Sequence, residues 1–211
     1  MNQIPIVLST QRTGSTFLFL HFHPTFKHVC FEPYNSEIQR EEYKEIAGAH
    51  EFKNRIMDPV AYFQYLSQFG VIDIKLEIAP KFVLEQIYKN HKRFNAVILS
   101  RRNMLRQYVS SLTAGRSVIF SDSKEQQEKP LTVDFDKFNA YRTMLYDHYL
   151  KAKNGVPDAP LVTYEDMDID SISHCLDTPV THTPGIKKLH NDYSFITNRK
   201  ALKTKYPLWP L

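Results

Sequence analysis

The segment at positions 9–16, Ser-Thr-Gln-Arg-Thr-Gly-Ser-Thr, has the residue types and spacing of an anion-binding turn. It follows the apolar run 4–9 and precedes an apolar stretch that begins at Phe17. Gly14 allows a sharp turn at the start of a helix, where unpaired N–H groups and the positive end of the helix dipole attract an oxyanion. The sequence therefore predicts a phosphate-binding turn between a buried strand and a helix.

This turn differs from the ATP-binding P-loop, whose pattern is G-x-x-x-x-G-K-[ST]. Ser9 stands where the first glycine would be, and Ser15 replaces the lysine. The forked guanidinium of Arg12 suits phosphate or sulfate and could supply the missing charge from inside the loop. Ser15 and Thr16 add hydroxyl donors. The alternative is an ordinary helix capped by serine and threonine, with an arginine there by chance.

Composition narrows the class of protein. The chain has 211 residues, of which 42% are hydrophobic and 24% charged, as expected for one globular domain over 1–211. The net charge of +4 suits an anionic ligand but is too small to indicate a nucleic-acid groove. Cys30 and Cys175 form no CxxC pair, so neither a disulfide framework nor a zinc site is predicted. The first residues lack a signal-peptide pattern and a membrane span, and we expect a cytoplasmic protein.

Apolar runs and helical patterns alternate along the chain, which predicts an α/β fold: a three-layer sandwich with a central parallel sheet. The predicted strands are 4–9, 71–76, 96–100 and 160–164. The predicted helices are 58–69, 80–92, 103–114 and 135–155. The segment 115–133 has neither periodicity and is long for a loop, so we predict a lid or an acceptor-binding loop there.

A second pattern of chemical interest follows the third predicted strand. Arg102 comes just after that strand, and Ser110 lies eight residues later on the next helix. This pair resembles the 3′-phosphate-binding element of sulfotransferases, and the first turn, S-T-x-R-T-G-S-T-x-L, resembles their 5′-phosphosulfate-binding loop. The two motifs occur in the family's order, each at a strand–helix junction.

Four further segments extend the resemblance to the carbohydrate and bacterial branch of the family. They are the F-E-P-Y segment at 31–34, the D-I-K-L strand at 73–76, the Y-E-D segment at 161–166 and the I-T-N segment near the end, at 193–198. The resemblance implies a P-loop-like fold, 3′-phosphoadenosine 5′-phosphosulfate as donor, 3′-phosphoadenosine 5′-phosphate as product, and no metal. The chain departs from the family in being short and in reading I-D-I-K where G-V-K is expected.

The resemblance also implies residue roles. Glu32 would be the general base, with Arg12 and Lys75 stabilising the charge on the departing phosphate. The residues implied for the 5′-phosphosulfate are Arg12, Thr13, Gly14, Ser15 and Thr16. Those implied for the 3′-phosphate are Arg102 and Ser110. Phe17 takes the place of an adenine-stacking tryptophan, and Lys187 and Lys188 would belong to the basic C-terminal loop that covers the nucleotide.

Several alternatives stay open at this stage. His28 lies near Glu32 and could replace it as base, and Lys75 could be a solvated lysine at a strand end. A nucleotide kinase would share the fold but should show the lysine that Ser15 replaces. A binding module that lost catalysis would keep the donor pocket. The acceptor, whether a small molecule or a carbohydrate, and the oligomeric state are not selected by the sequence.

Overall fold

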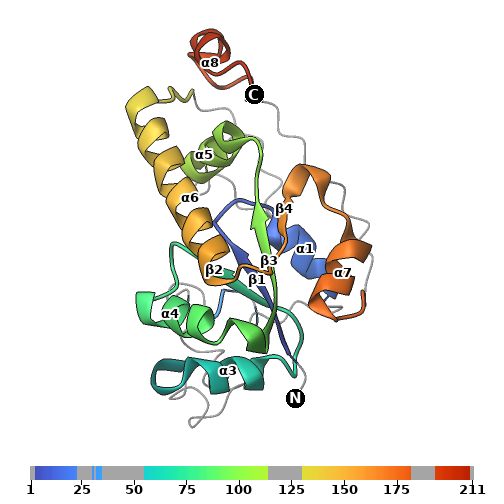
Figure 1. Ribbon diagram of the computed structural model, residues 1–211. Coiled ribbons are helices and arrows are strands. Elements are labelled where there is room, and N and C mark those ends of the chain that lie inside the picture. The colour runs from blue at the N-terminus through green and yellow to red at the C-terminus, as the bar shows by residue number, and fades with distance from the viewer. Residues whose placement is uncertain are drawn as a thin grey trace.

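The computed structural model describes residues 3–22, 30, 32–34, 55–113, 130–181 and 193–209 (Figure 1). Its centre is a parallel sheet in the order β2-β1-β3-β4. The strands are β1 (Ile4–Ser9), β2 (Ile72–Lys75), β3 (Phe94–Ser100) and β4 (Leu161–Thr163). All four predicted strands are therefore present, with ends that differ by at most two residues.

Helices cover both faces of the sheet (Figure 1). They are α1 (Ser15–Phe22), α3 (Pro59–Leu66), α4 (Lys81–Lys89), α5 (Met104–Thr113), α6 (Phe135–Gly155), α7 (Ile169–Leu176) and α8 (Arg199–Lys205). Short 3₁₀ turns occur at His91–Arg93 and Tyr164–Asp166. This arrangement confirms the α/β class and is compatible with three layers.

The alternation of β1 explains the two layers of helices, because successive side chains of a strand point to opposite faces. Ile6 and Leu8 belong to the large core cluster that also includes residues of α3, α4, α5 and α6. Val7 belongs to a smaller cluster with Leu18 of α1 and Ile172 of α7. A strand that is buried on both faces has a continuous apolar sequence, and the apolar run 4–9 predicts β1 for this reason.

Two helix ends differ from the predicted ones. Asp58 caps α3 as expected, since its carboxylate accepts the N–H of Ala61, but the helix ends at Leu66, before Gly70. Pro80 is the N-cap of α4 and not its first helical residue. α6 ends at Gly155, as the sequence predicts.

The strand order places the two sequence motifs next to each other. From β1 the chain moves to β2 on one side, whereas β3 lies on the other side of β1. Ligands of open parallel sheets bind at such a point, beyond the carboxyl ends of the strands. Ser9, the last residue of β1, pairs with Lys75 of β2, and it also pairs with Leu99 near the end of β3. The turn after β1 and the junction after β3 therefore share one edge of the sheet.

The segment predicted as a lid lies only partly within the described residues. Its end is attached to the C-terminal tail, because Leu131 forms an isolated bridge with Ile196. Asn198 completes the attachment: its side chain accepts the N–H of Val133 and donates to the carbonyl of the same residue. Residues 115–129 of the predicted lid lie outside the described part of the chain.

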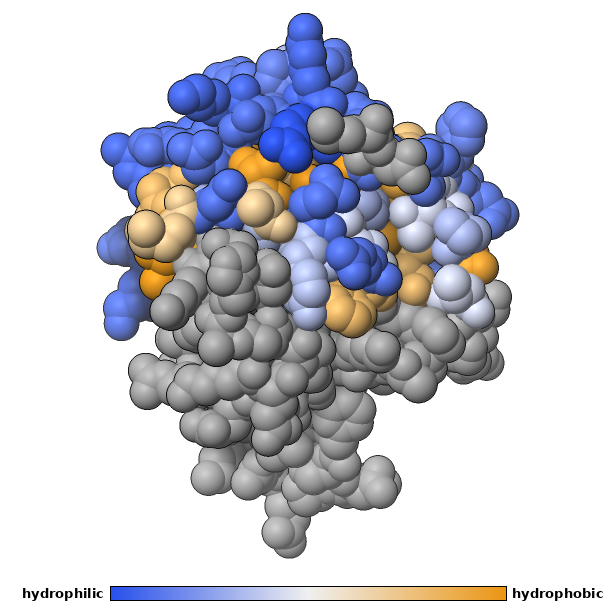
Figure 2. Space-filling model, turned by 90° about the horizontal axis from the view of Figure 1, so that it is seen from below, coloured by the Kyte–Doolittle hydropathy of each residue, from blue (hydrophilic) through white to orange (hydrophobic). Residues whose placement is uncertain are grey.

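The described surface is mostly hydrophilic in the view from below, with smaller apolar patches (Figure 2). Exposed apolar side chains include Ile56 and Met57 before α3, and Tyr146 and Leu150 on α6. Among the helices that the structure describes, none combines the length and the apolar character needed to cross a membrane.

Candidate functional site

The ammonium group of Lys75 is the centre of a buried polar cluster. Its Nζ donates to Oγ of Ser9 at 2.9 Å and to Oδ2 of Asp73 at 2.9 Å. It also donates to the hydroxyl of Ser15. Oε1 of Glu32 lies 3.6 Å from the same nitrogen. All five side chains are buried, so these contacts are made with little competition from water.

Strand pairing explains how these residues meet. Asp73 and Lys75 are two residues apart in β2, so their side chains lie on the same face of the sheet. Val7, directly opposite Asp73, packs against α1 on that face, and Ser9 is directly opposite Lys75. The side chain of Lys75 therefore reaches Ser15, the first residue of α1.

This contact changes the comparison with the ATP-binding P-loop. Ser15 occupies the position of the P-loop lysine in sequence, yet an ammonium group reaches its hydroxyl from the neighbouring strand. The loop lacks a lysine, but the site does not. The alternative that Lys75 is a solvated strand-end residue is wrong, because the side chain is buried and holds three acceptors.

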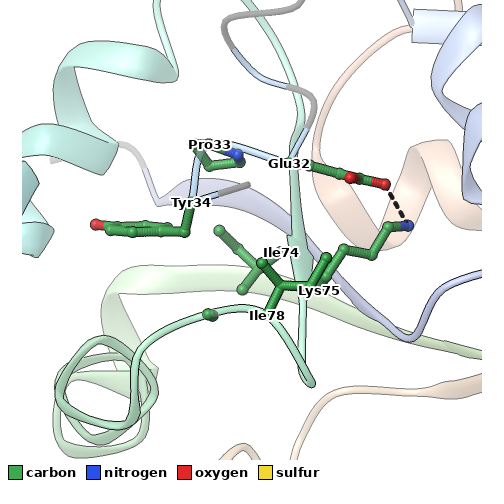
Figure 3. Close-up of a pocket in the computed structure, with 7 residues that line it drawn as sticks. Glu32, Pro33, Tyr34, Ile74, Lys75 and Ile78 are labelled. Atoms are coloured by element: carbon green, nitrogen blue, oxygen red, sulfur yellow. Dashed lines mark ion pairs between the residues drawn. The ribbon is translucent and has the colours of Figure 1, made fainter. Parts of the chain in front are cut away.

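Glu32 is held beside β2 by its own backbone. Its N–H donates to the carbonyl of Asp73 at 3.1 Å. Its φ of 52° lies in the left-handed region, which costs a residue with a side chain about 1–2 kcal/mol. Figure 3 shows the carboxylate pointing toward the Lys75 ammonium, at one side of a narrow pocket. The pocket is lined by Glu32, Pro33, Tyr34, Ile74, Lys75, Ile78 and Ala79.

The turn between β1 and α1 has two residues in the left-handed region, Arg12 with φ 61° and Gly14 with φ 88°. A Cβ atom on Gly14 would lie 2.2 Å from Cδ2 of Tyr164, so only glycine fits there. Thr13 is buried, and its hydroxyl donates to the carbonyl of Thr10 within the turn. Strained backbone of this kind concentrates at functional sites, and here it falls on two of the predicted site residues, Arg12 and Glu32.

The remaining turn residues differ in exposure. Thr16 is exposed, which leaves its hydroxyl accessible to a ligand. Phe17 is half-buried and meets the ring of Tyr164 edge-on, with centroids 6.4 Å apart. In the described part of the chain, the guanidinium of Arg12 has no carboxylate partner.

The junction after β3 is built differently. Arg102 forms an ion pair with Asp166, and both side chains are more than half exposed. Glu165 accepts the backbone N–H groups of Arg102 and Asn103, at 2.9 and 3.2 Å, just before α5 begins. Glu165 of the Y-E-D segment thus satisfies two backbone N–H groups just before α5. Within the described residues, Ser110 on α5 forms no hydrogen bond with Arg102.

Two polar residues of the site were missed by sequence analysis. Glu77, two positions after Lys75, accepts the backbone N–H of Gln11 in the phosphate turn. Gln107 of α5 is buried and donates to Thr10 Oγ1 at 2.8 Å and to the carbonyl of Gln11 at 2.7 Å. Gln107 lies three residues after Met104, on the apolar face of its helix. A polar residue on an otherwise apolar helix face could have indicated a buried hydrogen-bonding role from the sequence.

Three residues of the predicted site lie outside the described residues: His28, Lys187 and Lys188. Among the residues that are described, no group of three or more histidine, cysteine, aspartate or glutamate side chains is arranged to hold a metal ion.

No family model matches this chain, and neither a curated protein nor a solved structure matches it significantly. The resemblance to sulfotransferases therefore depends on the motifs and their order along the sequence.

The groups at the turn fit a doubly charged oxyanion such as a phosphosulfate. The first N–H groups of α1 have no partner within the helix, and they point to the side of the turn. Arg12 and Lys75 supply two cations, and Ser15 and Thr16 supply two hydroxyls. Oε1 of the Glu32 carboxylate lies 3.6 Å from the same ammonium group.

Proposed function

We propose that this protein is a sulfotransferase that moves a sulfuryl group from 3′-phosphoadenosine 5′-phosphosulfate to a hydroxyl acceptor. The observation that carries the proposal is the position of the Lys75 ammonium. It is hydrogen-bonded to Ser15 in the anion-binding turn and lies 3.6 Å from the Glu32 carboxylate. A candidate base and a candidate donor site therefore share one buried cation.

The donor supplies an activated sulfuryl group bonded to its 5′-phosphate. Glu32 takes the proton of the acceptor hydroxyl while that oxygen bonds to sulfur and the bond from sulfur to the phosphate oxygen breaks. The leaving phosphate keeps the electron pair of that bond. Arg12 and Lys75 stabilise its charge, since preorganised cations stabilise the transition state more strongly in a buried site than in water. Lys75 also holds Glu32 beside the acceptor position.

Calorimetry with 3′-phosphoadenosine 5′-phosphate, and separately with ATP plus Mg²⁺, tests the donor assignment. We expect the bisphosphate to bind at least tenfold more tightly, because it carries a 3′-phosphate that ATP lacks, and hydrogen bonds to such a charged group contribute about 1.5–3 kcal/mol. A preference for ATP would refute the proposed donor.

Replacement of Glu32 by glutamine tests the catalytic step. We expect release of 3′-phosphoadenosine 5′-phosphate from the donor, measured with a panel of hydroxyl acceptors, to slow by about 10²–10⁴-fold. Binding of the product should change little, because the amide keeps the size of the side chain. Glu85→Gln on α4, where the carboxylate is exposed and pairs with Lys81, is the matched control. An unchanged rate in Glu32→Gln would remove Glu32 as the base and leave a histidine such as His28 to be tested.

A P-loop phosphotransferase is the second candidate, favoured by the contact between Lys75 and the residue in the P-loop lysine position. Such an enzyme also needs a carboxylate that can reach Mg²⁺. Asp73 is the nearest one, but its two oxygens accept from Ser9 and from Lys75, and it is buried. This arrangement favours sulfuryl transfer, and the calorimetry with ATP plus Mg²⁺ separates the two.

A further inference from the structure

The backbone of the phosphate turn is held from outside by side chains that neither motif includes. Gln107 donates to the carbonyl of Gln11 at 2.7 Å. Arg101 donates to the carbonyl of Arg12 at 3.2 Å. Glu77 accepts the N–H of Gln11, and the hydroxyl of Thr13 donates to the carbonyl at the other end of that same peptide. Three consecutive peptide groups are thereby fixed in orientation.

Because the peptide group is planar, the contacts made by these carbonyls also determine the direction of the neighbouring N–H groups. In a trans peptide the carbonyl and the N–H point in opposite directions. Because Gln107 and Arg101 both belong to the segment that follows β3, the carbonyls of Gln11 and Arg12 point toward that segment. The N–H groups of Arg12 and Thr13 must therefore point away from that segment.

We infer that Gln107 and Arg101 are positioning residues that aim the N–H groups of Arg12 and Thr13 at a tetrahedral oxyanion beside Lys75. Consecutive N–H groups around a left-handed residue form a concave anion site, and Arg12 is such a residue. Glu77 keeps the N–H of Gln11 engaged, so that this group does not share in the anion site. The inference depends on the proposed anion-binding role of the turn, but not on which nucleotide carries the anion.

Two of the side chains that hold the turn, Gln107 and Glu77, are polar groups in buried surroundings, where a polar group is unfavourable. Gln107 is fully buried, and its Oε1 has no hydrogen-bond partner among the described residues. Burial raises the pKa of Glu77 above its ordinary value of 4.5, although the N–H of Gln11 and the charge of Lys75 act in the other direction. The chain therefore keeps two polar side chains beside the turn in surroundings that disfavour them.

Amide NMR on the full chain tests the inference directly. Titration with inorganic sulfate should shift the Arg12 and Thr13 amide resonances more than that of Gln11. In Gln107→Met, which keeps the length of the side chain but removes the donor, the shifts of both amides should shrink. Affinity for 3′-phosphoadenosine 5′-phosphate should fall about 3- to 10-fold, as expected for one lost hydrogen bond. Gln86→Met, on α4 and remote from the turn, should leave both unchanged.

A second pair of variants keeps the test sound if Gln107→Met fails to fold. Glu77→Gln retains an acceptor for the Gln11 N–H, whereas Glu77→Met removes it. We expect Glu77→Met to speed hydrogen exchange of the Gln11 amide and Glu77→Gln to restore wild-type exchange. In wild type the Gln11 amide shift should also titrate with Glu77 at a pH above 4.5, and this titration should vanish in Glu77→Gln. Other ionisable groups also lie near Glu77, namely Asp73, Tyr141 and Tyr149. Neither variant replaces them, so a difference between the two variants reports on residue 77.

The outcomes separate this inference from the proposed function. If sulfate shifts Arg12 and Thr13 but the bisphosphate does not bind, the inference stands and the proposed function fails. If the bisphosphate binds without shifting these two amides, or shifts them equally in Gln107→Met, the inference is overturned and the donor assignment stands.

Discussion

The two strand–helix junctions at the carboxyl edge of the sheet resemble each other in sequence but differ in structure. After β1, the cation Lys75 is buried and held by three acceptors. After β3, the cation Arg102 is more than half exposed and pairs with Asp166, which is equally accessible. One junction therefore holds its cation in a buried hydrogen-bonded cluster, whereas the other holds its arginine in an exposed ion pair.

This difference indicates where the two junctions would obtain their binding energy. Exposed ion pairs contribute about 0–1 kcal/mol, so an arriving phosphate can replace Asp166 at small cost. Buried charges are costly to expose or to leave alone, so the geometry around Lys75 is fixed before a ligand arrives. We therefore expect the first junction to determine the position of the reacting group and the second to select the nucleotide.

The largest expected effect comes from removing the cation of the first junction. Lys75→Met leaves the carboxylate of Asp73 buried without its partner, which should lower the free energy of unfolding by about 3–5 kcal/mol. Urea unfolding measures this loss. The double variant Lys75→Met with Asp73→Asn removes this pair of charges and should recover part of the stability, since the buried Glu32 carboxylate still lacks its cation. It should not recover the binding of 3′-phosphoadenosine 5′-phosphate.

Removal of the cation at the second junction gives the matched measurement of stability. Arg102→Met also removes a cation and leaves its carboxylate, Asp166, without that partner, yet it should change the free energy of unfolding by about 1 kcal/mol or less because both side chains are exposed. Equal losses of stability at the two junctions would contradict the difference that we describe.

A smaller effect is expected from Gly14→Ala, which tests how tightly the first junction is packed. The left-handed conformation costs alanine about 1–2 kcal/mol, and the new Cβ would also displace the ring of Tyr164. We expect thermal melts to show a loss of about 2–3 kcal/mol. Gly70→Ala is the control, since φ at Gly70 is also positive but that residue precedes β2, at the opposite edge of the sheet. If the two variants lose the same stability, the contact with Tyr164 contributes nothing.

The sequence was sufficient to predict the four strands, the helices between them and the strand–helix junctions that carry both motifs, whereas it gave no range for α7 or α8. The run 4–9 is apolar at each position because both faces of β1 are covered, and that pattern can be read without a structure. Gly14 and the hydroxyls beside it indicate a turn through local chemistry alone. Helix ends were less accurate, as at Pro80, because several residues near an end satisfy the capping rules equally well.

The interior of the site was not predictable, because it depends on contacts across strands. The register that sets Ser9 opposite Lys75 joins residues 66 positions apart, and no local pattern specifies it. The same is true of Gln107, whose partners belong to the turn after β1. Sequence analysis assigned Arg12 the charge missing from the loop, whereas the structure adds Lys75 from the neighbouring strand.

The last and smallest effect concerns the ion pair of the second junction. Arg102→Ala should weaken binding of 3′-phosphoadenosine 5′-phosphate by about tenfold or more, since hydrogen bonds to a charged group contribute about 1.5–3 kcal/mol. Asp166→Asn should instead tighten it by a few-fold, because the carboxylate no longer competes with the phosphate for the guanidinium. Adenosine 5′-phosphate, which lacks the 3′-phosphate, is the control ligand, and calorimetry should show that neither substitution alters its affinity. If both substitutions change the two affinities alike, Arg102 acts through the general charge of the edge and not through the 3′-phosphate. Ser110→Ala then tests whether the Ser110 hydroxyl contacts that phosphate, because only in that case would its loss weaken binding of the bisphosphate alone.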